Sequence, residues 1–433
     1  MIKYKGALLE MKKDSIEVSD KKLSLLELLQ ENDKKHLFTT KSNSIFLKTG
    51  FHLYDYFFGS VINIHDKDGN IIKQEPRVGQ AIGTLNLIIG NTGSGKTTFA
   101  IQLASNIIRP YENAQVIHYD CEQRTDLSRI ENISKLPGNF FNENKYILKT
   151  GMVGLDIIKE MIVKIYTNKM KIKDDLMIET EIEDEFGNKI KMFPPTVIII
   201  DSITSVIEET FSWENQKEVS DMEKLQSNTD GARSAKSLKG FFKDILPLCK
   251  EANIIIYAIN HINTNMSMSI IPVGKQQNYL KQDESIPGGK TMLYYPFNII
   301  KMIAKPNDDF VESSDGFSGH IVMIEPIKSS SNQSGNNSKG ISFELVFSFK
   351  NGFDPLRSII WYGKNKNLIE GTKNKLKFKD DPSFTFSFVN IDEEMNSKPI
   401  WENVKKYIIP ELNSHLSYVE PTKNKFDSRL MDY

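Results

Sequence analysis

One octapeptide constrains the fold of this 433-residue chain more than any other feature. Residues 90–97 read Gly-Asn-Thr-Gly-Ser-Gly-Lys-Thr and fit the pattern G-x-x-x-x-G-K-[ST] at every position. An apolar run of strand length, Leu85–Ile89, precedes the octapeptide, and Phe99–Ala104 reads as the start of a helix. Because the motif requires this strand–loop–helix setting, we predict a phosphate-binding loop rather than a glycine-rich turn that merely precedes a helix.

The chemistry of such a loop gives its residues distinct roles. Glycines let backbone N–H groups close around phosphate oxygens at a helix N-terminus, where the helix dipole favours negative charge. Lys96 is expected to reach the β- and γ-phosphates, and the Thr97 hydroxyl to bind Mg²⁺. The chain is therefore predicted to bind a nucleoside triphosphate. The predicted binding residues of this segment are Gly90, Asn91, Thr92, Gly93, Ser94, Gly95, Lys96, Thr97 and Thr98.

The surrounding pattern predicts an α/β fold with a central, mostly parallel sheet. Further strands are expected at Val116–Tyr119, Thr196–Ile200 and Ile254–Ile259. Continuous apolar strands separated by helical segments are typical of a parallel sheet that helices cover on both faces. Beyond Ile299 we expect the strands to be antiparallel, at His320–Ile324 and Ser342–Phe349.

Polar residues follow three of the predicted strands, at the edge where parallel strands end together. Asp201 is expected to share Mg²⁺ with Thr97 and to complete the neutralisation of the phosphate charge. Glu122 is a candidate base for activating water, and His261 a candidate contact to the γ-phosphate. A solvated loop acid and a surface histidine are the alternatives for these two residues.

Composition limits the cellular setting. The two cysteines have no C-x-x-C spacing, so neither a disulfide framework nor a zinc site is indicated, and a reducing, cytoplasmic location is expected. No apolar stretch approaches the roughly 20 residues of a membrane span, and the first residues lack the apolar core of a signal peptide. The net charge of −1 means that nucleic-acid binding would have to come from local patches.

The order of these motifs resembles the RecA family, and UvsX-type phage recombinases are the most similar members. The resemblance covers about residues 45–370 and rests on Asp-x-Glu at 120–122, Asp201-Ser202, Asn260-His261 and the run Pro287-Gly288-Gly289-Lys290. It implies a RecA-like ATPase core, and a DNA-dependent ATPase that uses ATP and Mg²⁺. A bacterium, or a bacterium infected by a phage, would be its setting.

The resemblance also implies roles for single residues. Glu122 would activate the attacking water, and Lys96 and His261 would act on the γ-phosphate. Arg129 stands where many family members stack a tyrosine on adenine, so it is expected to bind the nucleotide through a cation–π contact. Lys328 matches a lysine region that reaches a neighbouring protomer's ATP.

For DNA, the resemblance implies two binding loops, at about 208–230 and 262–287. The implied DNA-binding residues are Arg233, Lys236, Gly288, Gly289 and Lys290. The expected partners are single- and double-stranded DNA, further copies of the chain in a helical filament, and single-strand binding and loader proteins. No membrane partner is expected.

The chain is expected to divide into an N-terminal arm at 1–45, the core at 46–370 and a basic, aromatic extension at 371–433. Two β-hairpins, at about 61–76 and 170–192, are predicted as insertions into the core.

A run of lysines crosses the boundary between core and extension. Lys364–Lys379 is a candidate phosphate-contacting patch, with Phe378 as a stacking partner; a solvated lysine face is the alternative.

Three functions compete at this point. The first is a strand-exchange recombinase that forms ATP-dependent filaments on single-stranded DNA and serves recombination, repair and recombination-dependent replication. The second is a hexameric replicative helicase, which would need a helical N-terminal domain of about 100 residues where fewer than 50 precede the core. The third is a regulatory ATPase switch, which Glu122 disfavours because a binding switch needs no positioned base.

Overall fold

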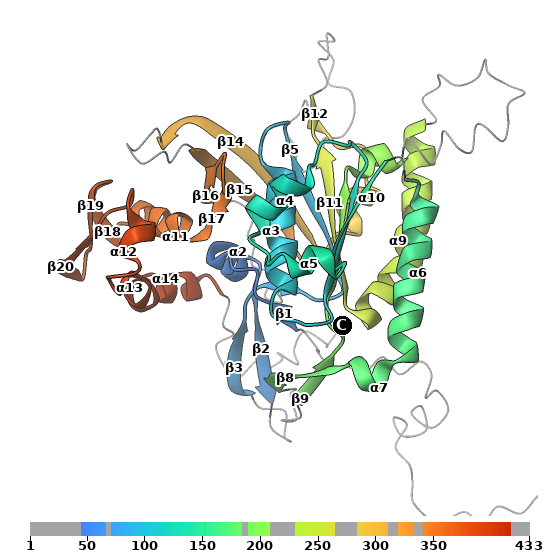
Figure 1. Cartoon of the computed structure of the whole chain (residues 1–433), viewed down its shortest axis with the longest axis horizontal. Helices are drawn as coiled ribbons and strands as arrows, with labels where there is room; N and C mark the ends of the chain where they lie inside the picture. Colours follow the sequence, from blue (N-terminus) through green and yellow to red (C-terminus); the bar gives the residue numbers. More distant parts are fainter. Residues whose placement is uncertain are drawn as a thin grey trace, which may run out of the picture. The chain divides into compact units, whose positions relative to one another are not determined.

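The computed structural model describes residues 45–65, 71–151, 153–183, 189–207, 230–264, 284–310, 319–331 and 341–416 (Figure 1). The chain divides after Ser42, and all described residues belong to the second unit, Asn43–Tyr433. All but the last residue of the predicted arm, and most of the two predicted DNA-binding loops, lie outside the described residues.

A nine-stranded sheet lies at the centre, in the strand order β17-β16-β15-β14-β5-β11-β10-β6-β7. The six strands from β14 to β7 run parallel, and the three pairs from β14 to β17 are antiparallel, which confirms the predicted α/β class. The strand bounds are β5 (Leu85–Gly90), β6 (Gln115–Asp120), β7 (Tyr146–Thr150), β10 (Thr196–Asp201), β11 (Ile254–His261), β14 (Asn298–Phe310), β15 (Gly319–Ser329), β16 (Phe343–Ser348) and β17 (Gly352–Asp354).

One strand differs from expectation. The expected antiparallel strands at 320–324 and 342–349 are confirmed in β15 and β16, whereas β14, also beyond Ile299, pairs in parallel with β5 on one side and antiparallel with β15 on the other. The reason is the connection before it, which returns the chain to the starting edge of the sheet. There the amide of Phe297 donates a hydrogen bond to the carbonyl of Leu85 (2.7 Å).

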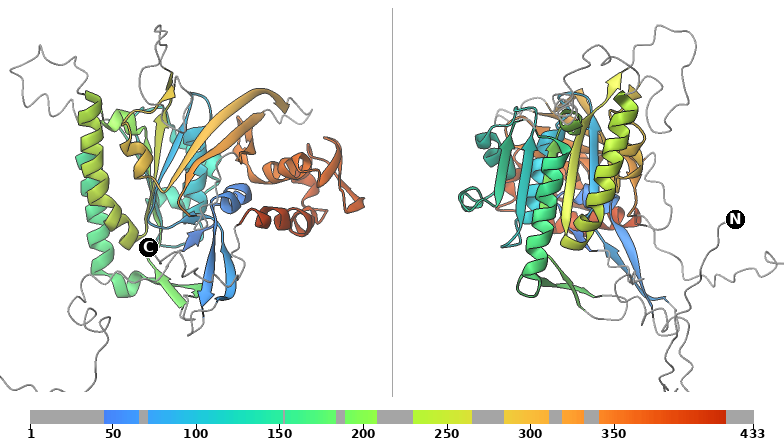
Figure 2. Two further views of the ribbon diagram at one scale, coloured as in Figure 1. Left: turned by 180° about the vertical axis from the view of Figure 1, so that it is seen from behind. Right: turned by 90° about the vertical axis from the view of Figure 1, so that its right-hand side faces the viewer.

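Helices cover both faces of the sheet, as Figure 2 shows. α3 (Lys96–Ile108) and α4 (Leu127–Ser134) lie on one face, and α6 (Leu155–Lys171) and α9 (Asp230–Ala252) lie side by side on the other. Side chains of a strand alternate between the two faces. In β10, accordingly, Val197 and Ile199 pack with the α3 side, whereas Ile198 and Ile200 pack with the α6 and α9 side. This explains why the central strands are largely apolar.

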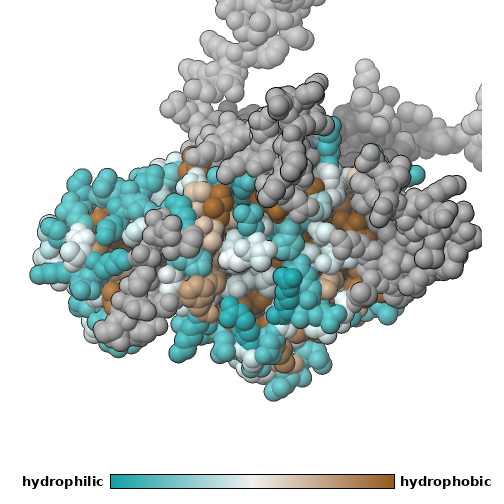
Figure 3. Space-filling model, turned by 90° about the horizontal axis from the view of Figure 1, so that it is seen from above, coloured by the Kyte–Doolittle hydropathy of each residue, from teal (hydrophilic) through white to brown (hydrophobic). Residues whose placement is uncertain are grey.

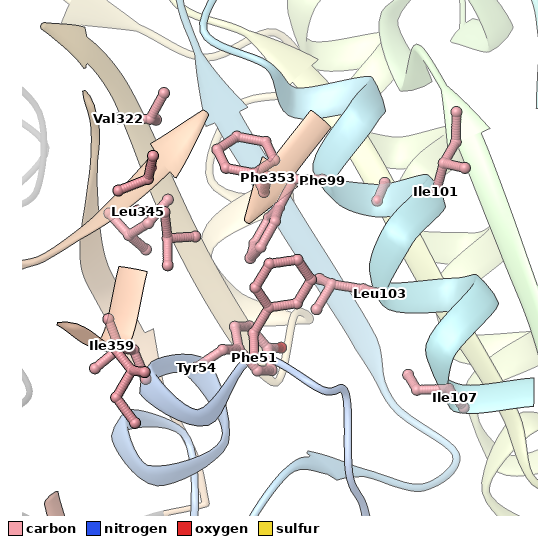
Figure 4. Close-up of a cluster of buried hydrophobic side chains, with 14 of the residues drawn as sticks. Phe51, Tyr54, Phe99, Ile101, Leu103, Ile107, Val322, Leu345, Phe353 and Ile359 are labelled. Atoms are coloured by element: carbon pink, nitrogen blue, oxygen red, sulfur yellow. The ribbon is translucent and has the colours of Figure 1, made fainter. Parts of the chain in front are cut away.

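An aromatic cluster fixes α3 behind the octapeptide (Figure 4). The Phe99 ring is fully buried and lies 5.3 Å from the ring of Phe51, 5.2 Å from that of Phe353 and 6.0 Å from that of Tyr54, all edge to face. Edge-to-face contacts of this kind add to the free energy gained by burying the rings. The start of α3 is therefore anchored to segments both before and after it in the sequence.

Replacing Phe99 with alanine is expected to lower the free energy of unfolding by about 3–5 kcal/mol, since the packed rings around it leave a cavity that collapses poorly. Urea denaturation followed by tryptophan fluorescence measures this loss. Phe99→Leu is the matched variant and should lose clearly less. A loss below about 1 kcal/mol in Phe99→Ala would show that the cluster does not hold α3.

Both predicted hairpins are present, with one correction of bounds. β2 (Ser60–His65) pairs with β3 (Ile71–Arg77), and β8 (Ile178–Glu183) pairs with β9 (Lys189–Met192). The second hairpin does not begin at 170, because the apolar period of α6 continues to Lys171 and α7 (Lys173–Leu176) follows. The two hairpins touch where the Arg77 guanidinium donates to the Glu183 carbonyl (3.2 Å).

The C-terminal part folds as helices around a small sheet, and the predicted boundary at 370/371 falls inside its first strand. Phe378 is not available for stacking on bases: it is fully buried against Phe386 and Tyr407, because alternate residues of its strand face the core. Part of the lysine run is also neutralised, since Lys377 pairs with Glu370 (3.6 Å). The elements are α11 (Pro355–Asn365), β18 (Ile369–Thr372), β19 (Lys375–Phe378), β20 (Asp381–Phe386), α12 (Ile391–Glu394), α13 (Ile400–Tyr407) and α14 (Ile409–Ser414).

Shorter elements complete the described structure. They are β1 (Phe46–Leu47), α2 (His52–Phe57), β4 (Gln80–Ala81), α5 (Asn139–Asn142), β12 (Asn263–Thr264), β13 (Glu284–Ser285) and α10 (Thr291–Tyr294). Within the described ranges, none of the helices has the length and apolar character needed to cross a membrane.

Candidate functional site

The octapeptide forms the turn between β5 and α3, and two of its glycines are required by their surroundings. A Cβ atom on Gly90 would lie 2.4 Å from the carbonyl oxygen of Met302. Gly95 has a φ of 83°, and a Cβ there would lie 2.9 Å from the Phe353 ring. Gly95 is also the N-cap of α3 and provides no side-chain cap, so the helix N-terminus is left open toward the turn. An open N-terminus of this kind attracts anions.

Lys96 lies inside the turn and is held by it. Its ammonium group donates to the carbonyls of Gly90 (2.9 Å) and Asn91 (2.8 Å). Burial lowers the pKa of Lys96, while the carboxylates of Asp201 and Glu122 act in the opposite direction. Because an ammonium has three hydrogens to donate, one remains for a further acceptor.

Thr97, in the first turn of α3, meets Asp201 at the end of β10, although β11 lies between β5 and β10 in the sheet. The Thr97 hydroxyl donates to Oδ2 of Asp201 (2.5 Å). The pKa of Asp201 is raised to about 6, and burial of the carboxyl is the main cause. A cation beside it would favour the ionised form.

Thr97 and Asp201 provide part of the set of oxygen ligands that a Mg²⁺ ion needs. No cluster of three or more His, Cys, Asp and Glu side chains suited to a metal occurs among the residues that the structure describes. Mg²⁺ commonly needs only one or two protein oxygens, because it keeps several waters and takes the rest from substrate phosphates. One hydroxyl and one carboxylate are such a set.

Glu122 has a partner for each carboxylate oxygen. His261 Nε2 lies 2.9 Å from Oε1, and Arg124 Nη1 lies 3.1 Å from Oε2. Burial alone would raise the pKa of Glu122, but hydrogen bonds from His261 and Ser202 outweigh it and bring the pKa below its ordinary value. Glu122 is therefore ionised at neutral pH, in a fixed orientation. Glu122 is thus not a solvated loop acid and His261 is not a free surface histidine, because both side chains are partly buried and bonded to each other.

The loop that carries Glu122 is itself fixed. Asp120 is buried at the end of β6, and its carboxylate accepts from the amides of Arg124 (3.3 Å) and Thr125 (2.7 Å). Asp126 then caps α4 through the amide of Ser128 (3.2 Å). The backbone of the loop is thus held while the Arg124 side chain extends to the surface, 70% exposed.

A cavity of about 350 Å³ brings most of the predicted residues together. From the turn and α3, its walls include Thr92, Gly93, Gly95, Lys96, Thr97 and Thr98. From other segments they include Glu122, Arg129, Asp201 and His261. Gly90 and Ser94 support the turn instead, the latter through a hydroxyl bond to the carbonyl of Asn91 (2.8 Å).

One end of the cavity has an aromatic wall that the sequence analysis missed. Phe347 and Phe349 line it together with Arg129, whose Nη1 donates to the Phe349 carbonyl (3.3 Å). Phe349 lies in the turn directly after β16 and is 60% exposed, which is unusual for a residue as apolar as phenylalanine. A flat apolar ring and a guanidinium in the wall of the same cavity suit the face of an aromatic base.

The predicted DNA-contacting residues lie in two segments that meet. Arg233 and Lys236 are in the first turns of α9, and Lys236 is exposed. The turn from Gly288 to the exposed Lys290 packs against the same helix, where the Thr291 hydroxyl donates to the Ala235 carbonyl (3.0 Å). A Cβ on Gly288, whose φ is 86°, would lie 2.7 Å from the side chain of Leu238 on α9.

Lys328 is not part of the cavity within its own chain. Its ammonium group donates to the carbonyls of Leu293 (3.3 Å) and Tyr294 (2.8 Å) at the end of α10. Burial lowers its pKa. Its expected reach toward a neighbouring protomer stays a prediction.

The parts of the chain labelled β5 and β12 lie at the top of Figure 1. Figure 3 shows the molecule from above, and its described surface is mainly hydrophilic with scattered hydrophobic residues. No protein-family model matches the chain, and no curated protein is significantly similar to it.

Proposed function

We propose that this chain is a RecA-like P-loop ATPase that acts on DNA as a recombinase. The observation that carries the proposal is one of geometry: the loop at 90–97, the Thr97–Asp201 contact and the Glu122–His261 pair come from four strands and converge on one cavity. Such a set matches the parts that phosphoryl transfer needs, which are a phosphate cradle, a metal-binding carboxylate and a base near the terminal phosphate.

In the proposed reaction, ATP binds with its phosphates on the loop and the start of α3. The ionised Glu122 takes a proton from a water molecule, whose oxygen attacks the γ-phosphorus while the bond to the β-phosphate oxygen breaks, giving ADP and phosphate. His261 orients Glu122 through the 2.9 Å contact. Thr97 and Asp201 would hold Mg²⁺, which neutralises phosphate charge when bound. Phe349 and Arg129 would receive the base.

The proposed action on DNA rests on different residues. Lys236 and Lys290 are exposed cations on segments that pack together, where both could contact the phosphates of one DNA strand. ATP hydrolysis and DNA binding would then occur at neighbouring strand ends of one sheet. We propose that copies of the chain assemble as a filament on single-stranded DNA and pair it with homologous duplex.

The experiment that tests this function combines two measurements. ATPase activity is measured with and without single-stranded DNA, and the complexes with a slowly hydrolysed ATP analogue are viewed by electron microscopy. We expect a stimulation of at least about 10-fold, and helical filaments. Closed six-membered rings would favour a replicative helicase, and activity that DNA leaves unchanged would favour a regulatory switch.

The Mg²⁺ role of Thr97 yields a separate prediction. Thr97→Ala is expected to raise the Mg²⁺ concentration needed for half-maximal ATPase activity by about 10- to 100-fold, because one metal-binding oxygen is lost. A Mg²⁺ titration at fixed ATP measures the shift. Thr97→Ser keeps the hydroxyl and should stay near the wild type. Equal Mg²⁺ requirements in all three proteins would remove Thr97 from the metal site.

A further inference from the structure

Asn260 has an unusual set of partners at the end of β11. It is fully buried, and it precedes His261 in the strand, so their side chains point to opposite faces. Its Oδ1 accepts from the Thr204 hydroxyl (2.7 Å) and from the amide of His261 (2.9 Å). Its Nδ2 donates to the carbonyl of Pro287 (3.0 Å). One side chain thus joins three segments that are distant in sequence.

Each partner belongs to a different part of the site. Thr204 lies in the helical residues 203–207, directly after the predicted metal-binding Asp201. The amide of His261 belongs to the residue that holds Glu122. Pro287 begins the turn that leads to Gly288 and Lys290. Asn260 is therefore positioned between the hydrolysis residues and the turn proposed to meet DNA.

The turn is also held on its other sides: β13, just before it, pairs with β12, which follows β11 directly, so Asn260 adds a side-chain link to a backbone one. Just before the turn, Glu284 accepts from the ammonium of Lys301 (2.8 Å), and both side chains are largely buried. Just after it, Thr291 bonds to α9 through the Ala235 carbonyl. A small movement of the end of β11 would consequently be passed to Pro287 rather than absorbed.

We propose that Asn260 is a positioning residue that couples the Glu122–His261 pair to the turn from Pro287 to Lys290. The part of this proposal that concerns DNA rests on the proposed function. A change at His261 when ATP binds shifts the backbone amide that Asn260 Oδ1 accepts from, and the Nδ2 bond carries that shift to the Pro287 carbonyl. Asn260 itself contacts neither nucleotide nor DNA in this scheme.

Asn260→Asp isolates the coupling bond. An ionised carboxylate keeps the acceptor oxygen for Thr204 and the His261 amide, but it cannot donate to Pro287 and repels that carbonyl. Because burial favours the protonated form, which can donate, the assays are repeated at alkaline pH, where the carboxylate is ionised. Thr204→Val is the matched control, because it removes a hydrogen bond to the same side chain while leaving the Asn260–Pro287 bond intact.

The DNA arm measures kcat and KM for ATP with and without single-stranded DNA. In Asn260→Asp we expect KM and the DNA-free kcat to stay within about threefold of the wild type, and DNA stimulation to fall about 10-fold or more. Thr204→Val should keep its stimulation. Undiminished stimulation in Asn260→Asp, or an equal loss of basal and stimulated rates in both variants, would overturn the proposal.

The second arm does not depend on DNA. Hydrogen exchange of the amides at 284–294 is compared with and without a slowly hydrolysed ATP analogue. The wild type should gain protection with nucleotide and Asn260→Asp should not; protection gained equally by both proteins would overturn the proposal. If DNA fails to stimulate the wild type, the proposed function fails, and this arm still decides the role of Asn260.

Discussion

Replacing Lys96 with alanine is expected to lower kcat/KM for ATP by at least about 100-fold. The ammonium group is the cation buried within the turn, held there by the carbonyls of Gly90 and Asn91. Without this ammonium group, the charge that develops on the transferred phosphoryl group loses a protein partner. The activation free energy should rise strongly, because the Lys96 ammonium is buried away from water. A coupled ATPase assay measures the loss in turnover, and the binding of a fluorescent ATP analogue measures the loss in affinity for the nucleotide.

The fold should survive this substitution, since the bonds of Lys96 are confined to the turn itself. Circular dichroism and the melting temperature test that point. Lys164→Ala, which removes an exposed lysine from α6 on the opposite face of the sheet, is the control and should leave activity unchanged. If Lys96→Ala hydrolysed ATP within threefold of the wild-type rate, the loop would not be a phosphate-binding loop.

Glu122→Gln is expected to lower kcat by about 10²- to 10⁴-fold while ATP still binds. Glutamine has nearly the same shape and can still bond to His261, but it cannot accept a proton from water. Because the pKa of Glu122 lies below its ordinary value, the wild-type base is ionised throughout the neutral range. Activity that depends on it should therefore be lost only at acidic pH, beyond the range in which an ordinary glutamate takes up a proton.

Single-turnover kinetics separates this effect from binding. The chemical step should slow, whereas the affinities for ATP and for oligonucleotide should stay within about threefold of the wild type. Glu143→Gln, at an exposed ion pair with Lys145, is the control for the loss of one carboxylate. An unchanged chemical step in Glu122→Gln would exclude this residue as the base.

Much of the fold could be predicted because it depends on local sequence. The strands at 85–89, 196–200 and 254–259 are almost entirely apolar, with Asn86 and Thr196 as the polar exceptions, and burial on both faces explains that pattern. The site residues that follow such strands, among them Glu122 and Asp201, could be placed at one edge because parallel strands end together.

The remaining features depend on contacts between segments far apart in the chain. The parallel pairing of β14 is decided by the return of the chain to Leu85, and the burial of Phe378 by the helices packed beneath its strand. The role proposed for Phe349 depends on its contact with Arg129, and the role proposed for Asn260 depends on its contact with Pro287. Spacing along the sequence contains no sign of either pair.

The central claim is that the terminal phosphate of ATP controls the hold on DNA, and the affinity for a fluorescent single-stranded oligonucleotide tests it most directly. The measurement is made with no nucleotide, with ADP and with a slowly hydrolysed ATP analogue, at one salt concentration because phosphate contacts depend on salt. The proposed coupling predicts binding at least about 10-fold tighter with the ATP analogue than in the other two states. Equal affinity in all three states would contradict it.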